Sequence, residues 1–249
     1  MNNDYIVIIP ARMGSSRFPG KPLAKIGKET MISRISRICS NNKYTKHVYV
    51  ATCDEIIKKE VEKNTFKAIL TSKKHTRASD RCNEALKKIE KKLKRRFKIV
   101  VMVQGDEPMI SSQMINKSIS ELIKAGNKYL VSNLVSYINK LEDFKDLNTI
   151  KIISNNFNEA TSFSRQPVPN MSIFKKKKAL RQVCVISFRR EGLMKFSKLR
   201  ETKNELLESV DMFRFLDNNI KIKLTFVNKL TYPVDTKADL KKINSLLFK

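Results

Sequence analysis

Short apolar runs alternate with helical patterns along the first half of the chain, and this alternation restricts the fold more than any other feature. A strand buried on both faces of a parallel sheet reads as a short apolar run without polar alternation. Such runs predict strands at 5–9, 47–52, 67–71 and 99–104. Helices are expected after them at 31–40, 54–63 (with Asp54 as its N-cap), 79–93 and 111–125. This order predicts an α/β fold with a mostly parallel sheet and helices on both faces.

The second half of the chain changes character. Its predicted strands alternate more regularly and lie at 129–137, 149–154, 162–168, 181–188 and 220–227. A helix is expected at 204–218, and a final helix begins after Asp235 or Thr236, either of which can cap it. With neither an internal repeat nor a Gly/Ser linker, we expect a single domain, residues 1–249, with an inserted antiparallel section at about 129–190.

Composition argues against two classes of partner. The 249 residues carry a formal net charge of +27, which is typical of nucleic-acid-binding proteins. However, the lysines are scattered, the run at 87–96 fits the solvated face of an amphipathic helix, and no aromatic residues are interleaved to stack on bases. No apolar run approaches the roughly 20 residues that cross a bilayer, and Asp4 stands where a signal peptide carries Lys or Arg. We therefore expect a cytoplasmic protein with no membrane insertion and no nucleic acid as its partner.

The segment PARMGSSRFPGKPL (10–23) follows the first predicted strand. In a doubly wound sheet, ligands bind beyond the carboxyl ends of the strands. Small residues let backbone N–H groups approach an anion there, and Arg12, Arg17 and Lys21 add positive charge. Turns alone would explain the glycines but not the three cations, and the glycine spacing excludes a P-loop. The loop therefore predicts a site for a polyphosphate, such as a nucleoside triphosphate.

The segment VQGDEP (103–108) ends another predicted strand, so Asp106 is expected to emerge at the same edge of the sheet. Carboxylate oxygens at such an edge suit Mg²⁺, which takes one or two protein carboxylates beside substrate phosphates and keeps several waters. Asp235, in PVDT after the last predicted strand, is expected to be the second ligand. The alternative role for Asp235 is that of a helix N-cap.

Six motifs closely resemble those of the bacterial 3-deoxy-manno-octulosonate (Kdo) cytidylyltransferase family, which activates 3-deoxy sugar acids. They are PARMGSSRFPGKPL, VQGDEPMI (103–110), NTIKII (148–153), FSRQPVP (163–169), NELLESVDMFR (204–214) and VDTKADL (234–240). All six lie in family order over nearly the whole chain. The resemblance implies a Rossmann-like, three-layer α/β/α nucleotide-diphospho-sugar transferase fold with a mostly parallel mixed sheet. It also implies a homodimer that pairs through the inserted section.

The activity that this resemblance implies is the Mg²⁺-dependent coupling of CTP to Kdo or a related 3-deoxy sugar acid. The products are the CMP-sugar and pyrophosphate, for lipopolysaccharide or surface polysaccharide synthesis. By resemblance, Arg12, Lys21 and Asp106 are catalytic, and Asp106 and Asp235 bind the metal. The implied nucleotide-binding residues are Arg12, Gly14, Ser15, Lys21, His75, Ser79, Asp80, Arg81 and Gln104.

The acceptor site departs from the family pattern. The residues expected to bind the acceptor are Gln104, Arg165, Gln182, Glu205 and Glu208. Arg165 suits the acceptor's carboxylate because arginine pairs with carboxylates bidentately, whereas Glu205 and Glu208 either accept bonds from sugar hydroxyls or are solvated. Gln182 and Ile186 stand where the family has His and Tyr, so one phenolic contact is lost. The acceptor thus remains open between Kdo, another ulosonic acid and a phosphonate. An inactive transferase scaffold that binds nucleic acid is the remaining alternative.

Overall fold

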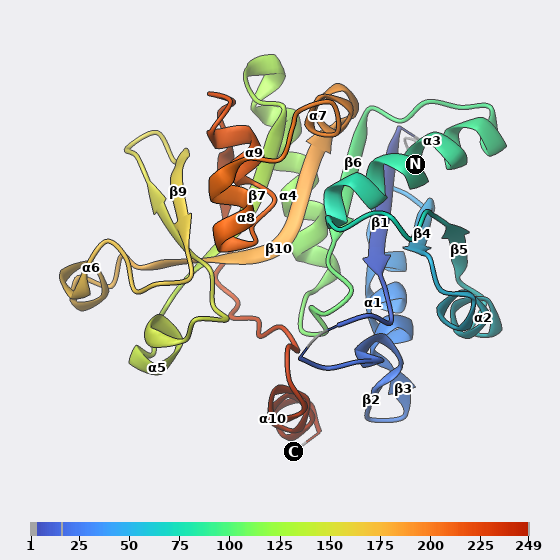
Figure 1. The fold of residues 1–249 in the computed structure, drawn as a ribbon, viewed down its shortest axis with the longest axis horizontal. Coiled ribbons are helices and arrows are strands. Elements are labelled where there is room, and N and C mark those ends of the chain that lie inside the picture. Colours follow the sequence, from blue (N-terminus) through green and yellow to red (C-terminus); the bar gives the residue numbers. More distant parts are fainter. Residues whose placement is uncertain (1–3, 16, 249) are drawn as a thin grey trace. The chain divides into compact units, whose positions relative to one another are not determined.

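The computed structural model describes residues 4–15 and 17–248 (Figure 1). The chain divides into two compact units, and each is described by itself below. The first unit comprises Met1–Asn116 and Thr231–Lys249, and the second comprises Lys117–Leu230. The first unit is therefore made of two segments that flank the second unit in the sequence. The predicted assignment of 1–249 to one domain with a section at 129–190 stays a prediction.

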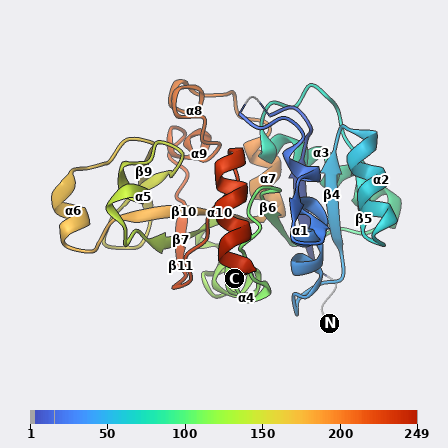
Figure 2. The same ribbon diagram turned by 90° about the horizontal axis from the view of Figure 1, so that it is seen from below.

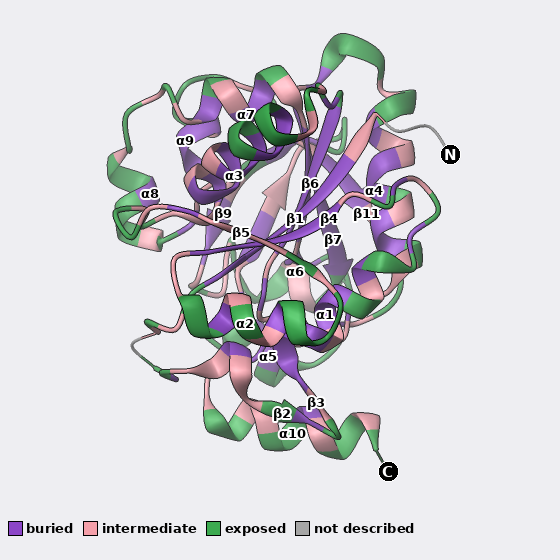
Figure 3. Cartoon of the chain, turned by 90° about the vertical axis from the view of Figure 1, so that its right-hand side faces the viewer, coloured by how far each residue is buried: buried purple, intermediate pink, exposed green. Residues whose placement is uncertain are grey.

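A parallel sheet forms the centre of the first unit. Its strands are β1 (Tyr5–Ala11), β4 (Val48–Thr52), β5 (Lys67–Leu70) and β6 (Ile99–Val103). Strand β1 pairs in parallel with β4 and β6, and β4 pairs in parallel with β5. Every residue of β4 and β6 is buried, which explains why these runs lack polar alternation (Figure 3). The predicted α/β fold and the four predicted strands are confirmed.

Helices connect these strands in the predicted order. They are α1 (Met31–Ser40), α2 (Glu55–Lys63) and α3 (Ala78–Leu93). Helix α1 packs against β4 and has the predicted bounds, because the Thr30 side chain accepts a hydrogen bond from the Ser33 amide and starts the helix (Figure 2). Asp54 is the N-cap residue of α2, as predicted, although its side chain makes no capping hydrogen bond.

Short elements after β1 were not predicted. They are the 3₁₀ helix η1 (Lys21–Leu23) and the hairpin of β2 (Lys25–Ile26) and β3 (Glu29–Thr30). Gly20 starts η1 with a φ of +75°, a conformation that side chains disfavour. The final helix α10 (Lys237–Leu247) lies beside this hairpin (Figure 3). The side chain of Asn244 on α10 accepts a hydrogen bond from the Gly27 amide at 2.9 Å, so the end of the chain is fixed to the segment after β1.

The second unit is built on a mixed sheet. Its strands are β7 (Val131–Tyr137), β8 (Lys151–Ser154), β9 (Ala160–Ser164), β10 (Leu180–Arg189) and β11 (Lys223–Phe226). Strand β10 pairs antiparallel with β7 and β8, and β8 pairs antiparallel with β9, as expected for the inserted section. Strand β11 pairs in parallel with β7. Parallel and antiparallel pairs together give the mixed sheet of a Rossmann-like α/β protein.

The helices of the second half differ from the prediction. The helix expected at 204–218 is wrong: the structure has α8 (Lys203–Glu208) and α9 (Phe213–Leu216). Ser209 separates them in a left-handed conformation with φ +52°, which an α-helix does not continue through. Helix α4 (Ser112–Lys124) agrees with the expected 111–125. Further short elements were not predicted, namely η2 (Gly126–Lys128), α5 (Leu141–Lys145), α6 (Met171–Lys175) and α7 (Arg190–Phe196).

Within residues 4–15 and 17–248, no helix has the length and apolar character needed to span a bilayer.

Candidate active site

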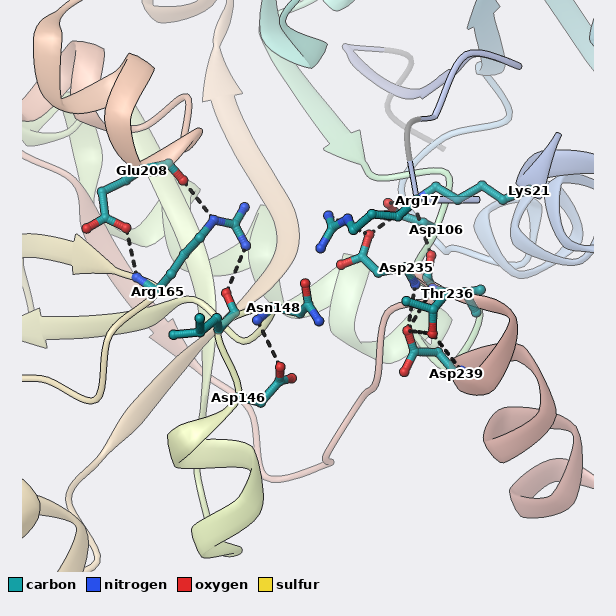
Figure 4. Close-up of polar contacts among 12 residues, drawn as sticks. Arg17, Lys21, Asp106, Asp146, Asn148, Arg165, Glu208, Asp235, Thr236 and Asp239 are labelled. Atoms are coloured by element: carbon teal, nitrogen blue, oxygen red, sulfur yellow. Dashed lines mark hydrogen bonds and ion pairs between the residues drawn. The ribbon is translucent and has the colours of Figure 1, made fainter. Parts of the chain in front are cut away.

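One lysine brings two carboxylates together in the first unit. The Nζ of Lys21 donates to Asp106 Oδ2 at 2.6 Å, to Asp235 Oδ1 at 3.3 Å and to the Val234 carbonyl at 3.1 Å (Figure 4). Asp106 follows β6, and Asp235 lies just before α10. The Val234 amide also donates to the Asp106 carbonyl at 2.8 Å, which holds the two segments side by side. Three residues that the sequence predicted for one site therefore meet there.

The charges of this cluster support each other. The Lys21 side chain is 14% exposed, and those of Asp106 and Asp235 are 25% and 15% exposed. Burial lowers the pKa of Lys21, but attraction to Asp106 and then to Asp235 outweighs it, so its pKa is raised above the ordinary value. Lys21 therefore remains a cation at neutral pH. Arg17 Nη2 adds a second positive group 3.1 Å from Asp235 Oδ1.

The alternative role of Asp235 as a helix cap is not the one that the structure shows. Thr236 caps α10: its Oγ1 accepts from the Asp239 amide at 3.2 Å, and Asp239 Oδ2 accepts from the Thr236 amide at 2.8 Å. This reciprocal pair is a capping box. The carboxylate of Asp235 is thus directed to Lys21 and Arg17 (Figure 4).

The predicted phosphate loop lies directly after β1. Arg12 and Gly14 are exposed, and a Cβ added at Gly14 would meet no atom within 4 Å. The amides of Ser15 and Gly20 both donate to the Met13 carbonyl at 3.0 Å, which folds the loop back on itself. The Ser15 amide predicted to face a phosphate is therefore used within the loop in this structure.

In the HTRASDR segment (75–81), the predicted nucleotide-binding residues mainly shape the loop. The buried Arg81 donates from Nη1 to Thr71 Oγ1 at 2.7 Å and from Nη2 to the His75 carbonyl at 3.2 Å. Ser79 is fully buried, with its Oγ 3.8 Å from the Met102 sulfur. Asp80 lies in the first turn of α3 and is partly exposed.

His75 pairs with Glu84, an acid that the sequence analysis did not single out. Glu84 also accepts from the Ser72 amide at 3.0 Å and pairs with Lys88 at 2.7 Å. Burial raises the pKa of Glu84, but the hydrogen bonds from Lys88, Ser72 and His75 outweigh it and lower this pKa to about 2. The i, i+4 spacing of Glu84 and Lys88 on α3 indicated the ion pair between these two residues, whereas no local spacing indicated the contact of Glu84 with His75.

Arg165 has a defined position in the second unit. Its Nε donates to the Glu208 carbonyl at 2.8 Å, and its Nη1 donates to the Leu147 carbonyl at 3.2 Å (Figure 4). The Glu208 carboxylate accepts from the Arg165 amide at 2.9 Å and from Ser164 Oγ at 3.1 Å. Glu208 thus supports the segment that carries Arg165, which is a different task from the predicted contact with sugar hydroxyls.

Glu205 lies inside the protein and is fully buried. Its Oε2 accepts from Arg214 Nε at 2.8 Å, and its Oε1 accepts from Arg214 Nη2 at 2.7 Å. The Thr202 side chain and Glu205 also form the capping box of α8. A sugar hydroxyl would have to displace these bonds, so the geometry favours a structural role for Glu205.

The remaining predicted acceptor residues belong to β10 and the end of β6. Gln182 is buried, and its Nε2 donates to Asn133 Oδ1 at 2.6 Å. Ile186 is 3% exposed, and the pairing register of β10 shifts between Val183 and Ile186. Gln104 follows β6 and is partly exposed. The residues that replace the family's His and Tyr thus pack into the second unit.

The donor set of the first unit fits a divalent cation. The carboxylates of Asp106 and Asp235 lie within 2.6 and 3.3 Å of the Lys21 ammonium nitrogen, so a divalent cation held by both would take the place that this nitrogen occupies here. Two hard carboxylate oxygens leave coordination positions for water and phosphate, which is how Mg²⁺ is usually held beside a nucleotide.

Comparisons with known proteins show what the whole chain is similar to. A family model described as Cytidylyltransferase matches residues 6–223. The 3-deoxy-manno-octulosonate cytidylyltransferase of Thermodesulfovibrio yellowstonii is 34% identical over 247 residues, covering 94% of this chain and 94% of that protein. The Escherichia coli protein of the same name is 32% identical over 243 residues, covering 97% and 95%.

A solved structure extends the likeness to the fold. The CMP:2-keto-3-deoxy-manno-octonic acid synthetase complexed with CTP superposes with a TM-score of 0.87 at 31% identity. The match covers 98% of each chain. The match of the family model, the full-length relatives and this shared fold lead to one conclusion: the chain belongs to the cytidylyltransferase family and is a nucleotidyltransferase of the 3-deoxy-manno-octulosonate cytidylyltransferase type.

Proposed function

We propose that this chain is a Mg²⁺-dependent enzyme that couples CTP to Kdo or a related 3-deoxy sugar acid, giving the CMP-sugar and pyrophosphate. The observation that carries the proposal is the convergence of Lys21, Asp106 and Asp235 in the first unit. Such an arrangement can hold both a divalent cation and the phosphates of a nucleotide. The relatives' names support Kdo as the acceptor, and the CTP complex of a similar protein supports CTP.

In the proposed reaction, the anomeric hydroxyl oxygen attacks the α-phosphorus of CTP, its proton passes to solvent, and the bond to pyrophosphate breaks. Arg12 and Lys21 hold the triphosphate, and Asp106 and Asp235 would hold Mg²⁺. When bound, the ion neutralises phosphate charge and lowers the pKa of the attacking hydroxyl. The protein contributes mainly by positioning and by charge neutralisation. In this structure burial lowers the pKa of Lys21 but Asp106 and then Asp235 raise it by more, so Lys21 is a cation that can pair with the triphosphate.

Arg165 is proposed to bind the carboxylate of the acceptor. Its guanidinium donates to the Glu208 and Leu147 carbonyls, and these two bonds fix the orientation of the guanidinium plane. A carboxylate would bind in that plane. The product would serve lipopolysaccharide or surface polysaccharide synthesis. We also propose the cytoplasm as the place of the reaction and, from the family resemblance, a homodimer as the active form.

Pyrophosphate release from the purified protein tests this function. The assay contains CTP and Mg²⁺ with Kdo, another ulosonic acid or a phosphonate, and parallel samples contain EDTA or replace CTP with UTP. We expect release that requires both Kdo and the metal and that falls with UTP. Because Gln182 and Ile186 replace the family's His and Tyr, a second candidate is the same reaction on another acidic acceptor. Release only with another acid would favour that candidate, and no release with any acid would contradict both.

A further inference from the structure

The side chain of Asp54 reaches from the end of β4 to the loop after β1. Its Oδ2 accepts a hydrogen bond from the Met13 amide at 2.8 Å, between residues 41 positions apart in the sequence. An acid at the N-cap of a helix ordinarily accepts from the first amides of that helix. The side chain of Asp54 makes no such bond to α2. Its carboxylate is therefore directed to the loop and not to its own helix.

Asp54 is itself held in place. Its amide donates to Thr52 Oγ1 at 3.1 Å, and Thr52 is fully buried. Its carbonyl accepts from the Ile57 amide at 3.1 Å and so starts α2. The Cys53 thiol lies 3.5 Å from the same Oδ2 that receives the Met13 amide. These bonds hold Asp54 between a buried strand and a helix, so its carboxylate is placed to support the Met13 amide.

Met13 is the residue on which the loop closes. Its carbonyl accepts from the amides of Ser15 and Gly20, both at 3.0 Å, while its amide points to Asp54. Arg12 precedes Met13 in the chain and Gly14 follows it, and both are expected to bind the triphosphate. One hydrogen bond to Met13 thus sets the place of the two residues beside it.

We propose that Asp54 is a positioning residue, which holds Met13, and with it Arg12 and Gly14, in the place that receives the triphosphate of CTP. This inference rests on the proposed function, since it assigns Asp54 to the nucleotide side of that reaction. A hydrogen bond to a charged acceptor is stronger than a neutral one. Its loss frees the Met13 amide and lets Arg12 and Gly14 leave their places, so the cost falls on CTP binding.

The test compares Asp54→Ala and Asp54→Asn with Glu55→Ala as the matched control. Glu55 is the neighbouring acid at the same end of α2, with a side chain 60% exposed, and its ion pair is with Lys58 on its own helix. Three quantities are measured: the Kd for CTP without acceptor, the KM values for CTP and acceptor, and the exchange rate of the Met13 amide by ¹⁵N-methionine NMR. Asp54→Glu is a further variant that keeps the charge but displaces the carboxylate by one methylene.

We expect Asp54→Ala to raise the Kd and the KM for CTP about tenfold and to speed exchange at Met13, with the acceptor KM unchanged. Asp54→Asn should recover most of this loss because its amide oxygen still accepts from Met13, whereas Asp54→Glu should not. Equal effects of Asp54→Ala and Glu55→Ala would overturn the proposal, since they would show an effect of charge at the helix end. Wild-type CTP affinity and exchange in Asp54→Ala would also overturn it. If the wild-type protein itself bound no CTP, the proposed function would fail instead. The Met13 exchange rates would then still show whether Asp54 holds the Met13 amide.

Discussion

The buried ion pair of Glu205 and Arg214 gives a prediction that separates a structural role from a catalytic one. Two hydrogen bonds of 2.8 and 2.7 Å join the side chains, which are 0% and 3% exposed. Removal of one partner from such a pair leaves a buried charge uncompensated and costs about 3–5 kcal/mol. Glu201 lies 3.6 Å from Arg214 Nη2 and is 41% exposed, so it can compensate in part. We therefore expect Glu205→Ala to lower the free energy of unfolding by about 3 kcal/mol, at the lower end of that range.

Urea unfolding followed by circular dichroism measures this change, and steady-state kinetics on the same variant measure the acceptor KM. Glu201→Ala is the control, because it removes a carboxylate on the surface and should cost less than about 1 kcal/mol. The acceptor KM of Glu205→Ala should equal that of the wild type. A variant that unfolds as the wild type does but has an acceptor KM raised tenfold would refute the structural assignment, since Glu205 would then act on the sugar.

Three further changes have definite expected outcomes. Asp106→Asn should lower kcat by roughly 100-fold or more with an unchanged circular dichroism spectrum, because one charge that would hold the metal is lost; wild-type turnover would contradict the metal assignment. Arg165→Ala should raise the acceptor KM about tenfold and leave the CTP KM unchanged, and equal effects on both would remove Arg165 from the acceptor site. Burial lowers the pKa of the buried Lys151 to about 8. The attraction of Asp146 opposes this shift, and the positive charges of Arg165 and Arg181 add to it. The unfolded chain keeps this proton up to a pKa near 10.5, so wild-type stability relative to Lys151→Met should rise by up to about 1.4 kcal/mol per pH unit between pH 8 and 10.5. If the difference in urea midpoint between the wild type and Lys151→Met stayed constant from pH 8 to 10.5, the lowered pKa of Lys151 would be contradicted.

The first half of the fold could be predicted because burial on both faces leaves a simple pattern. Strands β4 and β6 are wholly buried, and their sequences are short apolar runs bounded by polar segments. Helix α1 begins at a threonine cap that the sequence displays. The predicted helix at 204–218 is wrong because apolar spacing alone does not reveal a left-handed residue such as Ser209.

The site was predictable in part, for two different reasons. Asp106 could be placed because residues that follow parallel strands gather at one edge of the sheet, and the motifs resemble a known family. The local sequence PVDTKAD did not separate Asp235 from Thr236 as a cap, although Thr236 and Asp239 have the spacing of a capping box. The same spacing in TKNE, from Thr202 to Glu205, was a signal that Glu205 supports a helix.

Asp54 was harder to assign from sequence. The segment CDEII offers an N-cap aspartate before a helix, and its backbone does take that position. The partner of its side chain lies 41 residues earlier, and no local pattern encodes a contact over that separation. Only the pairing of β1 with β4 brings the two strand ends together.

The contact between Lys21 and Asp235 joins positions 214 residues apart, near the two ends of the chain. During synthesis, the ribosome releases Asp235 only after the whole of the second unit, Lys117–Leu230, has been made. A prematurely terminated product would therefore carry the cationic loop and Asp106 but could not form the charge centre. Fragments that end before Asp235 are therefore expected to be inactive.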